Sequence, residues 1–128
     1  MCYKIFIHLD FIFHEQKTMV NKVILIGNVG KDPEVRYVSS GIASCTLSLA
    51  TSEIYHDKQG NKTTRTEWHR VALWRGLAEF AEKHIRKGTL IYVEGRLSTR
   101  NYTDRDGNSH TIAEVIAAEV RLLGNKQN

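Results

Sequence analysis

Two tryptophans and an arginine stand at even-numbered positions of the segment Thr66–Trp74. In an extended strand, side chains two residues apart point to the same face, so Trp68, Arg70 and Trp74 share one side. The other side carries His69 and aliphatic residues, which suit a core. Flat rings beside a cation can stack unpaired bases and contact their phosphates. The segment therefore predicts a surface for single-stranded nucleic acid, and a core position for both tryptophans is the competing interpretation.

A second segment, residues 89–102, alternates in the same way. Its expected inward side chains are Ile91, Val93 and Leu97. The opposite face is polar and basic, with Glu94, Arg96, Ser98, Arg100 and Tyr102. Two tyrosines, Tyr55 in one long loop and Tyr102 at a hairpin end, would flank the aromatic strand and complete a groove. The remaining candidate cations, each an ordinary solvated charge when taken singly, are Lys22, Arg36, Arg86 and Lys87.

The sequence offers no chemistry for catalysis. Its histidines, at positions 8, 14, 56, 69, 84 and 110, lack metal-ligand spacing, and Cys2 and Cys45 cannot complete a zinc site with them. It contains no phosphate-binding glycine loop and no nucleophile motif. Asp104 and Asp106 could be carboxylates of a metal-dependent nuclease, but the hairpin turn around them accounts for both. We expect a binding protein that is not an enzyme and uses no cofactor or metal.

Composition and length fit one globular domain. The chain has 128 residues, of which 41% are hydrophobic and 25% charged, and a formal net charge of +4. This mild positive charge is compatible with a polyanionic partner and equally with solubility alone. No apolar run approaches the ~20 residues that span a membrane. Two distant cysteines provide no disulfide framework, so we expect a cytoplasmic protein without membrane contact.

The remaining pattern indicates the elements that position these residues. Strands are expected over residues 22–29, 43–50, 66–75, 89–102 and 111–123, with a short continuation over 35–38. A helix is expected over Gly76–Lys87, capped by Gly88, because apolar residues recur there at helical spacing: Leu77, Phe80, Ala81, His84 and Ile85. Residues 51–64 are expected to form a protruding hairpin loop. Residues 111–123 could also be helical, but the turn before them calls for a partner strand.

Three strands, one helix and two strands, in that order, match the OB-fold. This is an all-β, five-stranded Greek-key barrel with one α-helix between strands 3 and 4. A five-stranded α+β sandwich is the alternative. The domain is expected to span residues 19–124. Residues 1–18 are expected to be a flexible or non-native extension before a natural start at Met19, or else an extra edge strand, and residues 125–128 a short polar tail.

Several segments resemble the family of bacterial single-stranded DNA-binding proteins, in the family's order. They are residues 20–28 (VNKVILIGN), 32–37 (DPEVRY), 49–53 (LATSE), 66–71 (TEWHRV), 77–79 (LAE), 86–88 (RKG) and 92–100 (YVEGRLSTR). The likeness runs from about Met19 to Leu123. It implies an OB-fold protein, usually a homotetramer, that binds and protects single-stranded DNA independently of sequence during replication, recombination and repair. The implied location is the nucleoid in the cytoplasm.

The resemblance also implies roles for single residues. Stacking positions align with Tyr55, Trp68, Trp74 and Tyr102, and basic positions on the DNA path align with Lys22, Arg36, Arg70, Lys87 and Arg100. His69 aligns with a histidine at a subunit interface. The departures are tyrosine where tryptophan is common, at Tyr55 and Tyr102, and Ser98 and Asn101 where basic residues are common. The family's linker and acidic tip do not follow Gly124, so the resemblance does not extend to recruiting replication and repair proteins.

Two other functions stay open. An OB-fold accessory of the primosome, resembling the primosomal replication protein N, would act as a scaffold whose protein contacts dominate. The segment at 66–70 (TEWHR) and its aromatic pair argue against that reading. An OB module for RNA or oligosaccharide is only weakly excluded by the sequence.

Overall fold

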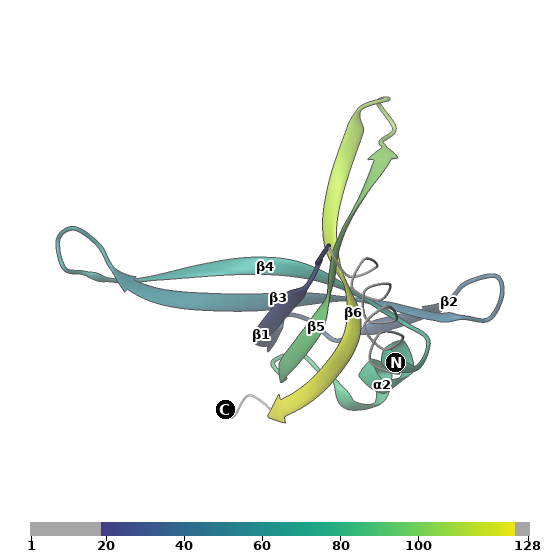
Figure 1. The fold of residues 1–128 in the computed structure, drawn as a ribbon, viewed down its shortest axis with the longest axis horizontal. Helices are drawn as coiled ribbons and strands as arrows, with labels where there is room; N and C mark the ends of the chain where they lie inside the picture. The colour runs from purple at the N-terminus through teal and green to yellow at the C-terminus, as the bar shows by residue number, and fades with distance from the viewer. Residues whose placement is uncertain (1–18, 125–128) are drawn as a thin grey trace, which may run out of the picture.

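The computed structural model describes residues 19–124 of the chain (Figure 1). Its elements, in order, are β1 (Val23–Val29), β2 (Glu34–Tyr37), β3 (Ala43–His56), β4 (Lys62–Trp74), α2 (Gly76–His84), β5 (Leu90–Thr103) and β6 (Ser109–Gly124). The expectations for residues 1–18 and 125–128 lie outside the described residues. No helix within residues 19–124 is long and apolar enough to cross a membrane.

The strands close into a barrel. The sheet runs in the order β1-β5-β6-β4-β3-β2, and a further pairing of β1 with β3 joins its ends. Neighbouring strands are antiparallel except β4 and β6, which pair in parallel at Val71 and Val115. Both β1 and β2 pair with β3, so they are two halves of one barrel strand, separated at residues 30–33. The prediction of a five-stranded OB-fold barrel with one helix between strands 3 and 4 is confirmed, and the α+β sandwich is excluded.

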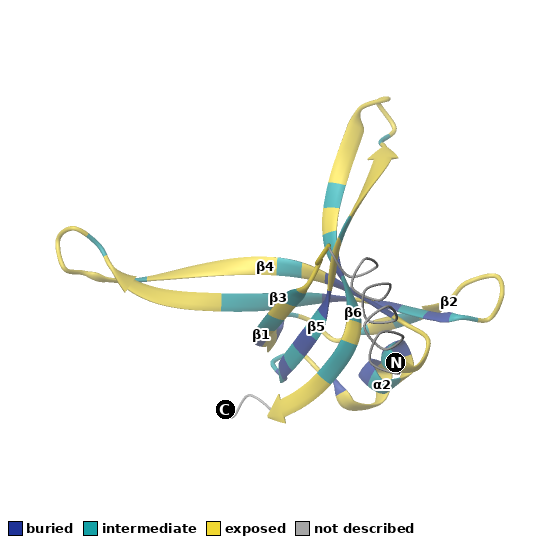
Figure 2. Ribbon diagram, in the orientation of Figure 1, coloured by how far each residue is buried: buried dark blue, intermediate teal, exposed yellow. Residues whose placement is uncertain are grey.

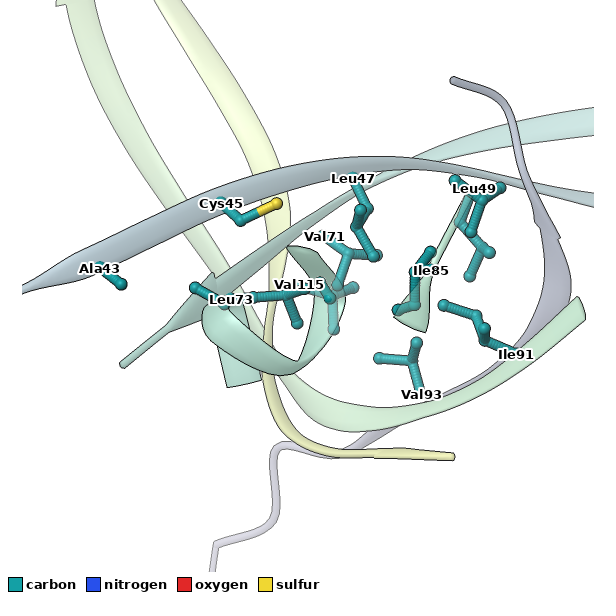
Figure 3. Close-up of a cluster of buried hydrophobic side chains, with 13 residues drawn as sticks. Ala43, Cys45, Leu47, Leu49, Val71, Leu73, Ile85, Ile91, Val93 and Val115 are labelled. Atoms are coloured by element: carbon teal, nitrogen blue, oxygen red, sulfur yellow. The ribbon is translucent and has the colours of Figure 1, made fainter. Parts of the chain in front are cut away.

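Alternating side chains build the interior of the barrel. In β3, Cys45, Leu47 and Leu49 are buried, while the small polar residues between them face outward. The other strands and the end of the helix contribute to the same cluster, which includes Val71, Leu73, Ile85, Ile91, Val93 and Val115 (Figure 3). Because successive strand side chains point to opposite faces, burying this set leaves the other set on the outside of the barrel.

Two hairpins extend beyond the barrel as long arms (Figure 1). The pairing of β3 with β4 continues to His56 and Lys62, and that of β5 with β6 to Thr103 and Ser109. Figure 2 shows that the outer parts of both arms are mostly exposed. Residues 51–64, expected as a loop, are therefore largely paired strands around a short turn. Both segments are polar, so the apolar alternation that indicates a strand is absent although their backbones are paired.

The prediction that Leu97 points into the core is wrong. Ile91 and Val93 are fully buried and Gly95 continues their face, but Leu97 is exposed. The pairing of β5 with β1 ends at Gly95, so Leu97 lies beyond the part of β5 that is paired with β1. The Leu97 backbone N–H donates to Asn21 Oδ1 at 2.9 Å, and the Asn21 amide donates to the Leu97 carbonyl at 2.8 Å.

Helix α2 is shorter than expected, and Gly88 does not cap it. The helix ends at His84, and Ile85 already has an extended backbone. Ile85 is fully buried, so the chain leaves the helix where this side chain enters the core. Gly88, with φ at 91°, lies in a turn closed by the Thr89 N–H, which donates to the Arg86 carbonyl at 3.0 Å. His84, expected on the buried face, is exposed.

Two glycines allow neighbouring barrel strands to approach closely. A Cβ at Gly27 would overlap the carbonyl oxygen of Ala50 on β3. A Cβ at Gly95 would overlap the carbonyl oxygen of Ile116 on β6, next to a register irregularity between these strands. Since backbone cannot give way as a flexible side chain can, both positions require glycine.

Candidate nucleic-acid interface

Strand β4 presents the predicted aromatic and basic residues on its outer face. The side chains of Trp68 and Trp74 are 59% and 44% exposed, while Val71 and Leu73 on the other face are fully buried. The prediction that the indoles point outward is confirmed, and the interpretation that places them in the core is wrong. Across the ladder, β3 sets small side chains beside them: Ser44 opposite Trp74, Ser48 opposite Arg70 and Ala50 opposite Trp68. Small neighbours leave the indole rings open to a ligand.

Three adjoining clefts connect this face to cations from other elements. The first is lined by Lys31, Arg36 and Arg70, and the second by Lys31, Arg70 and Trp68. The third is lined by Trp68 and Lys87. Neighbouring clefts share lining residues, so they lie side by side along this face, and we call the three together the track. It leads from Arg36 past Arg70 and Lys31 to the indole of Trp68, and on to Lys87.

The indole of Trp68 rests against the backbone of the break between β1 and β2. A Cβ built on Gly30 would lie 2.6 Å from Trp68 Cζ3 and 3.0 Å from its Cη2. The Gly30 N–H also donates to the Ser48 carbonyl at 2.8 Å, which fixes this backbone to β3. The absence of a side chain at Gly30 therefore gives the indole its place.

An acidic side chain joins two of the predicted cations. Glu114 of β6 lies beside Arg70 because β4 and β6 run parallel there, with Oε2 3.5 Å from Arg70 Nε. Its Oε1 lies 3.6 Å from Arg100 Nε. The Glu114 side chain is only 13% exposed, whereas the two arginines are about half exposed. The structure thus brings Arg70 and Arg100 together around one carboxylate.

Tyr102 lies on the second arm, paired with His110 across the hairpin. The two rings are stacked, with centroids 5.0 Å apart and planes inclined by 23°. His110 Nε2 lies 2.6 Å from Asp104 Oδ2. This hydrogen bond, followed by that from the Asn108 N–H, holds the pKa of Asp104 below its ordinary value. Register places Tyr102, Arg100 and Glu114 on the same face of the β5–β6 ribbon.

Tyr55 does not join the groove that the sequence suggested. It pairs with Thr63, and the register of β3 with β4 places it on the reverse face of the ribbon from Trp68. Its ring lies beneath Arg65, whose Cζ is 5.9 Å from the ring centroid. A strand of nucleic acid that touches both aromatic residues has to pass around the edge of this arm. The role of Tyr55 in binding stays a prediction.

Lys22 and Arg96 lie apart from the track and line a different cleft, beside Met19 and Val20. Lys22 Nζ is 3.5 Å from Glu94 Oε2. The Tyr92 hydroxyl donates to Glu94 Oε1 at 2.8 Å. This hydrogen bond, before the charge of Lys22, lowers the pKa of Glu94, and it is also the main cause that raises the pKa of Tyr92. Lys22 is thus already engaged with a carboxylate on the β1–β5 face.

Two more predicted residues have structural partners. Arg86 Nη1 donates to the carbonyls of Glu82 and Ile85, both at 2.7 Å, so this guanidinium holds the end of α2. His69 is half-buried on the inward face of β4, with Nε2 2.8 Å from Thr51 Oγ1. Within residues 19–124, no group of three or more histidine, cysteine or acidic side chains could hold a metal ion.

The sequence analysis missed Lys31, Glu114 and His110. Lys31 lies in the break between the two halves of the first barrel strand, and it lines two of the three clefts. The only sequence signal was its position directly after Gly30, in a segment between two strands where side chains do not alternate in a regular way. Nothing in the sequence marks Glu114 and His110 as site residues, because strand pairing alone brings them near their partners Arg70 and Tyr102.

Comparisons with known proteins agree on one family. The model of the family described as "Single-strand binding protein family" matches residues 20–123. A "Single-stranded DNA-binding protein" of Neisseria meningitidis serogroup A is 47% identical over 107 residues, which cover 84% of this chain and 62% of that protein. The "Single-stranded DNA-binding protein 1" of Xylella fastidiosa is 47% identical over 110 residues, covering 85% of this chain and 81% of that protein. The chain thus spans less than two thirds of the Neisseria relative.

A solved structure shares the fold. The structure titled "Plasmodium falciparum SSB complex with ssDNA" aligns with a TM-score of 0.75 and 32% sequence identity, covering 82% of this chain and 96% of that chain. The alignment therefore extends over almost the whole of that protein and most of the described barrel and arms.

Proposed function

We propose that this chain, which belongs to the single-strand binding protein family, binds single-stranded DNA without sequence preference and protects it during replication, recombination and repair. One observation carries the proposal: the exposed indole of Trp68 lines two clefts, one with Lys31 and Arg70 and the other with Lys87. Relatives named for single-stranded DNA binding, and the fold shared with a protein solved with single-stranded DNA, support it.

The track suits an unpaired strand because it offers both of the contacts that such a strand needs. The Trp68 ring can stack on any base, since every base has a π-face, at about 1–3 kcal/mol per base. Lys31 and Arg70 on one side and Lys87 on the other can meet the phosphates of flanking nucleotides. In a duplex the base faces are already stacked and paired, so this surface favours single strands. Binding of this kind needs no catalysis, and we propose none.

Titration with oligo-dT, followed by intrinsic fluorescence, tests the proposal. Trp68 and Trp74 are the two tryptophans of the chain and both are exposed, so stacking should quench the emission strongly. A duplex of equal length should compete poorly, and a mixed-sequence oligonucleotide should compete well. An unquenched emission with no measurable binding, or preference for the duplex, would contradict the proposed function. Competition with oligo-rU separates DNA from RNA binding.

We further propose that the chain assembles as a homotetramer and acts at the nucleoid in the cytoplasm, as the family resemblance implies. Strand β1 pairs with β5 along Val23–Asn28 and with β3 only at its end, so one edge of residues 23–27 has no strand partner in the described chain. Ile24 and Ile26 on this strand are each 54% exposed. An unpaired edge with exposed apolar side chains favours pairing with another copy.

The mass of the protein in solution tests the assembly. Light scattering after size exclusion should give four times the chain mass, and a monomer mass would contradict it. His69 is proposed to lie at a subunit contact, so His69→Ala should lower the mass at dilute concentration before it lowers DNA affinity per subunit. An unchanged mass at every concentration would remove His69 from the interface.

A further inference from the structure

Carboxylates lie on a face proposed to hold a polyanion: Glu34 lines the first cleft, and Glu114 forms ion pairs with two arginines. Glu114 lies within 3.6 Å of both Arg70 and Arg100, two of the cations expected to contact DNA phosphates. Its side chain is 13% exposed, so it is fixed beneath the guanidinium groups while they face solvent. No other acidic side chain lies in an ion pair with either arginine in the described chain.

We propose that Glu114 sets the electrostatic strength of the DNA-binding face by competing with phosphates for Arg70 and Arg100. The inference rests on the proposed function and adds a residue that moderates it. In the free protein the carboxylate neutralises part of the charge of the two arginines. A phosphate that arrives then meets cations that already have an anionic partner, so the gain in binding free energy is smaller.

The fold explains why this carboxylate reaches both arginines. Arg70 and Glu114 are neighbours across the parallel pairing of β4 and β6, one residue before the pair of Val71 and Val115. Arg100 of β5 is paired with Ile112 of β6, which lies two residues from Glu114 on the same face. Since Glu114 sits at the point where three strands meet, a charge there acts on the barrel face and on the base of the second arm together.

Counterion release supplies a measurable consequence. Condensed counterions lie along the DNA, and each phosphate that a protein cation neutralises on a single strand releases some of them and adds about 0.7 to the steepness of log K against log salt. A cation paired internally contributes less. Removing the charge of Glu114 should therefore make the slope steeper by up to about 0.7 and tighten binding at low salt by about two- to fivefold, the size of one partly exposed charge interaction.

The experiment compares Glu114→Gln with the matched control Glu119→Gln. Glu119 lies on the same strand and is paired with one arginine, Arg121 Nη2 at 2.6 Å, so both variants change the net charge equally. Labelled oligo-dT is titrated by fluorescence anisotropy over a range of sodium chloride, with thermal melts and light scattering to check folding and assembly. Glu114→Gln should bind more tightly at low salt with a steeper slope, and Glu119→Gln should match the parent protein.

Several outcomes overturn the inference. If a folded Glu114→Gln protein binds oligo-dT more weakly, or with an unchanged slope of log K against log salt, Glu114 does not compete with phosphates. If Glu119→Gln gains as much affinity as Glu114→Gln, the effect comes from net charge alone. Glu114→Met, of similar volume, serves in its place if the glutamine variant unfolds, with the same expected gain. In the Arg70→Gln/Arg100→Gln background the gain should vanish, and its persistence would also overturn the inference. Failure of the parent protein to bind any oligonucleotide would instead contradict the proposed function.

Discussion

The Trp68 indole lies directly over Gly30, so closely that a Cβ on this glycine would come within 2.6 Å of Trp68 Cζ3. Gly30 lies in the break between β1 and β2, whereas Trp68 lies on β4. Their contact places the ring between the second and third clefts. The position of the stacking ring therefore depends on the absence of a side chain at Gly30 as well as on the tryptophan itself.

Gly30→Ala should weaken binding of oligo-dT while leaving the barrel folded. The methyl group displaces the far end of the indole, which can move at small cost to stability, but the ring then leaves the place between the clefts. We expect a loss of affinity of about 1 kcal/mol, part of the stacking contribution of one base. Fluorescence titration and a thermal melt measure the two effects. Normal affinity in a variant with a normal melting temperature would show that the position of the ring is not set by Gly30.

Lys31→Ala should reduce the salt dependence of binding. Lys31 lines the first two clefts between Arg36 and Trp68, so its ammonium group is placed to meet a phosphate. Loss of one such contact lowers the slope of log K against log salt by about 0.7. Lys83→Ala, on the exposed side of α2, removes the same charge away from the clefts and serves as the control. Equal slopes for the two variants would exclude a phosphate contact at Lys31.

Asp104 should titrate below its ordinary value of 3.8, chiefly because of its hydrogen bond with His110. A carboxyl group whose pKa is lower in the folded state contributes stability above the unfolded value, and this stability is lost as the pH falls through the folded pKa. Because the hydrogen bond with His110 is the main cause of the lowered pKa, His110→Ala should move the pKa of Asp104 back up towards 3.8. Side-chain carbon NMR across the acid range measures it, and an unmoved titration in the variant would refute the role of His110.

Gly95→Ala should destabilise the protein. The new Cβ would overlap the Ile116 carbonyl, which cannot move without breaking the β5–β6 ladder. Overpacking of this kind costs about 1–3 kcal/mol. Urea unfolding measures the change, and Gly107→Ala gives a contrast, because a Cβ at Gly107 meets no atom within 4 Å although its φ of 85° adds backbone strain. Equal stability of Gly95→Ala and the parent protein would show that the strands can separate here without cost.

Alternation made part of the site predictable. The period of two in β4 is enough to separate Trp68 and Arg70 from Val71 and Leu73, and the structure agrees. The same reasoning failed at Leu97, because alternation does not reveal where a strand leaves the barrel. Tyr55 was expected in a loop, because the polar residues around it do not reveal that β3 and β4 stay paired there, so the face that it occupies could not be predicted.

Contacts between distant strands were beyond the sequence. Glu114 meets Arg70 only because the barrel closes with a parallel pairing of β4 and β6. Neither strand carries a local pattern that fixes this register. Lys31 escaped for a related reason: it lies in the irregular segment between β1 and β2, where neither strand nor helix periodicity assigns a direction to a side chain.

The affinity of Trp68→Ala for oligo-dT decides whether this indole stacks on a base. The variant removes the ring that lines the clefts of Lys31 and Arg70 and of Lys87, and Trp74, which remains, still reports folding through its emission. Stacking by Trp68 predicts a loss of about 1–3 kcal/mol, or roughly five- to 150-fold in the dissociation constant. A folded Trp68→Ala protein that binds oligo-dT as tightly as the parent would contradict the account.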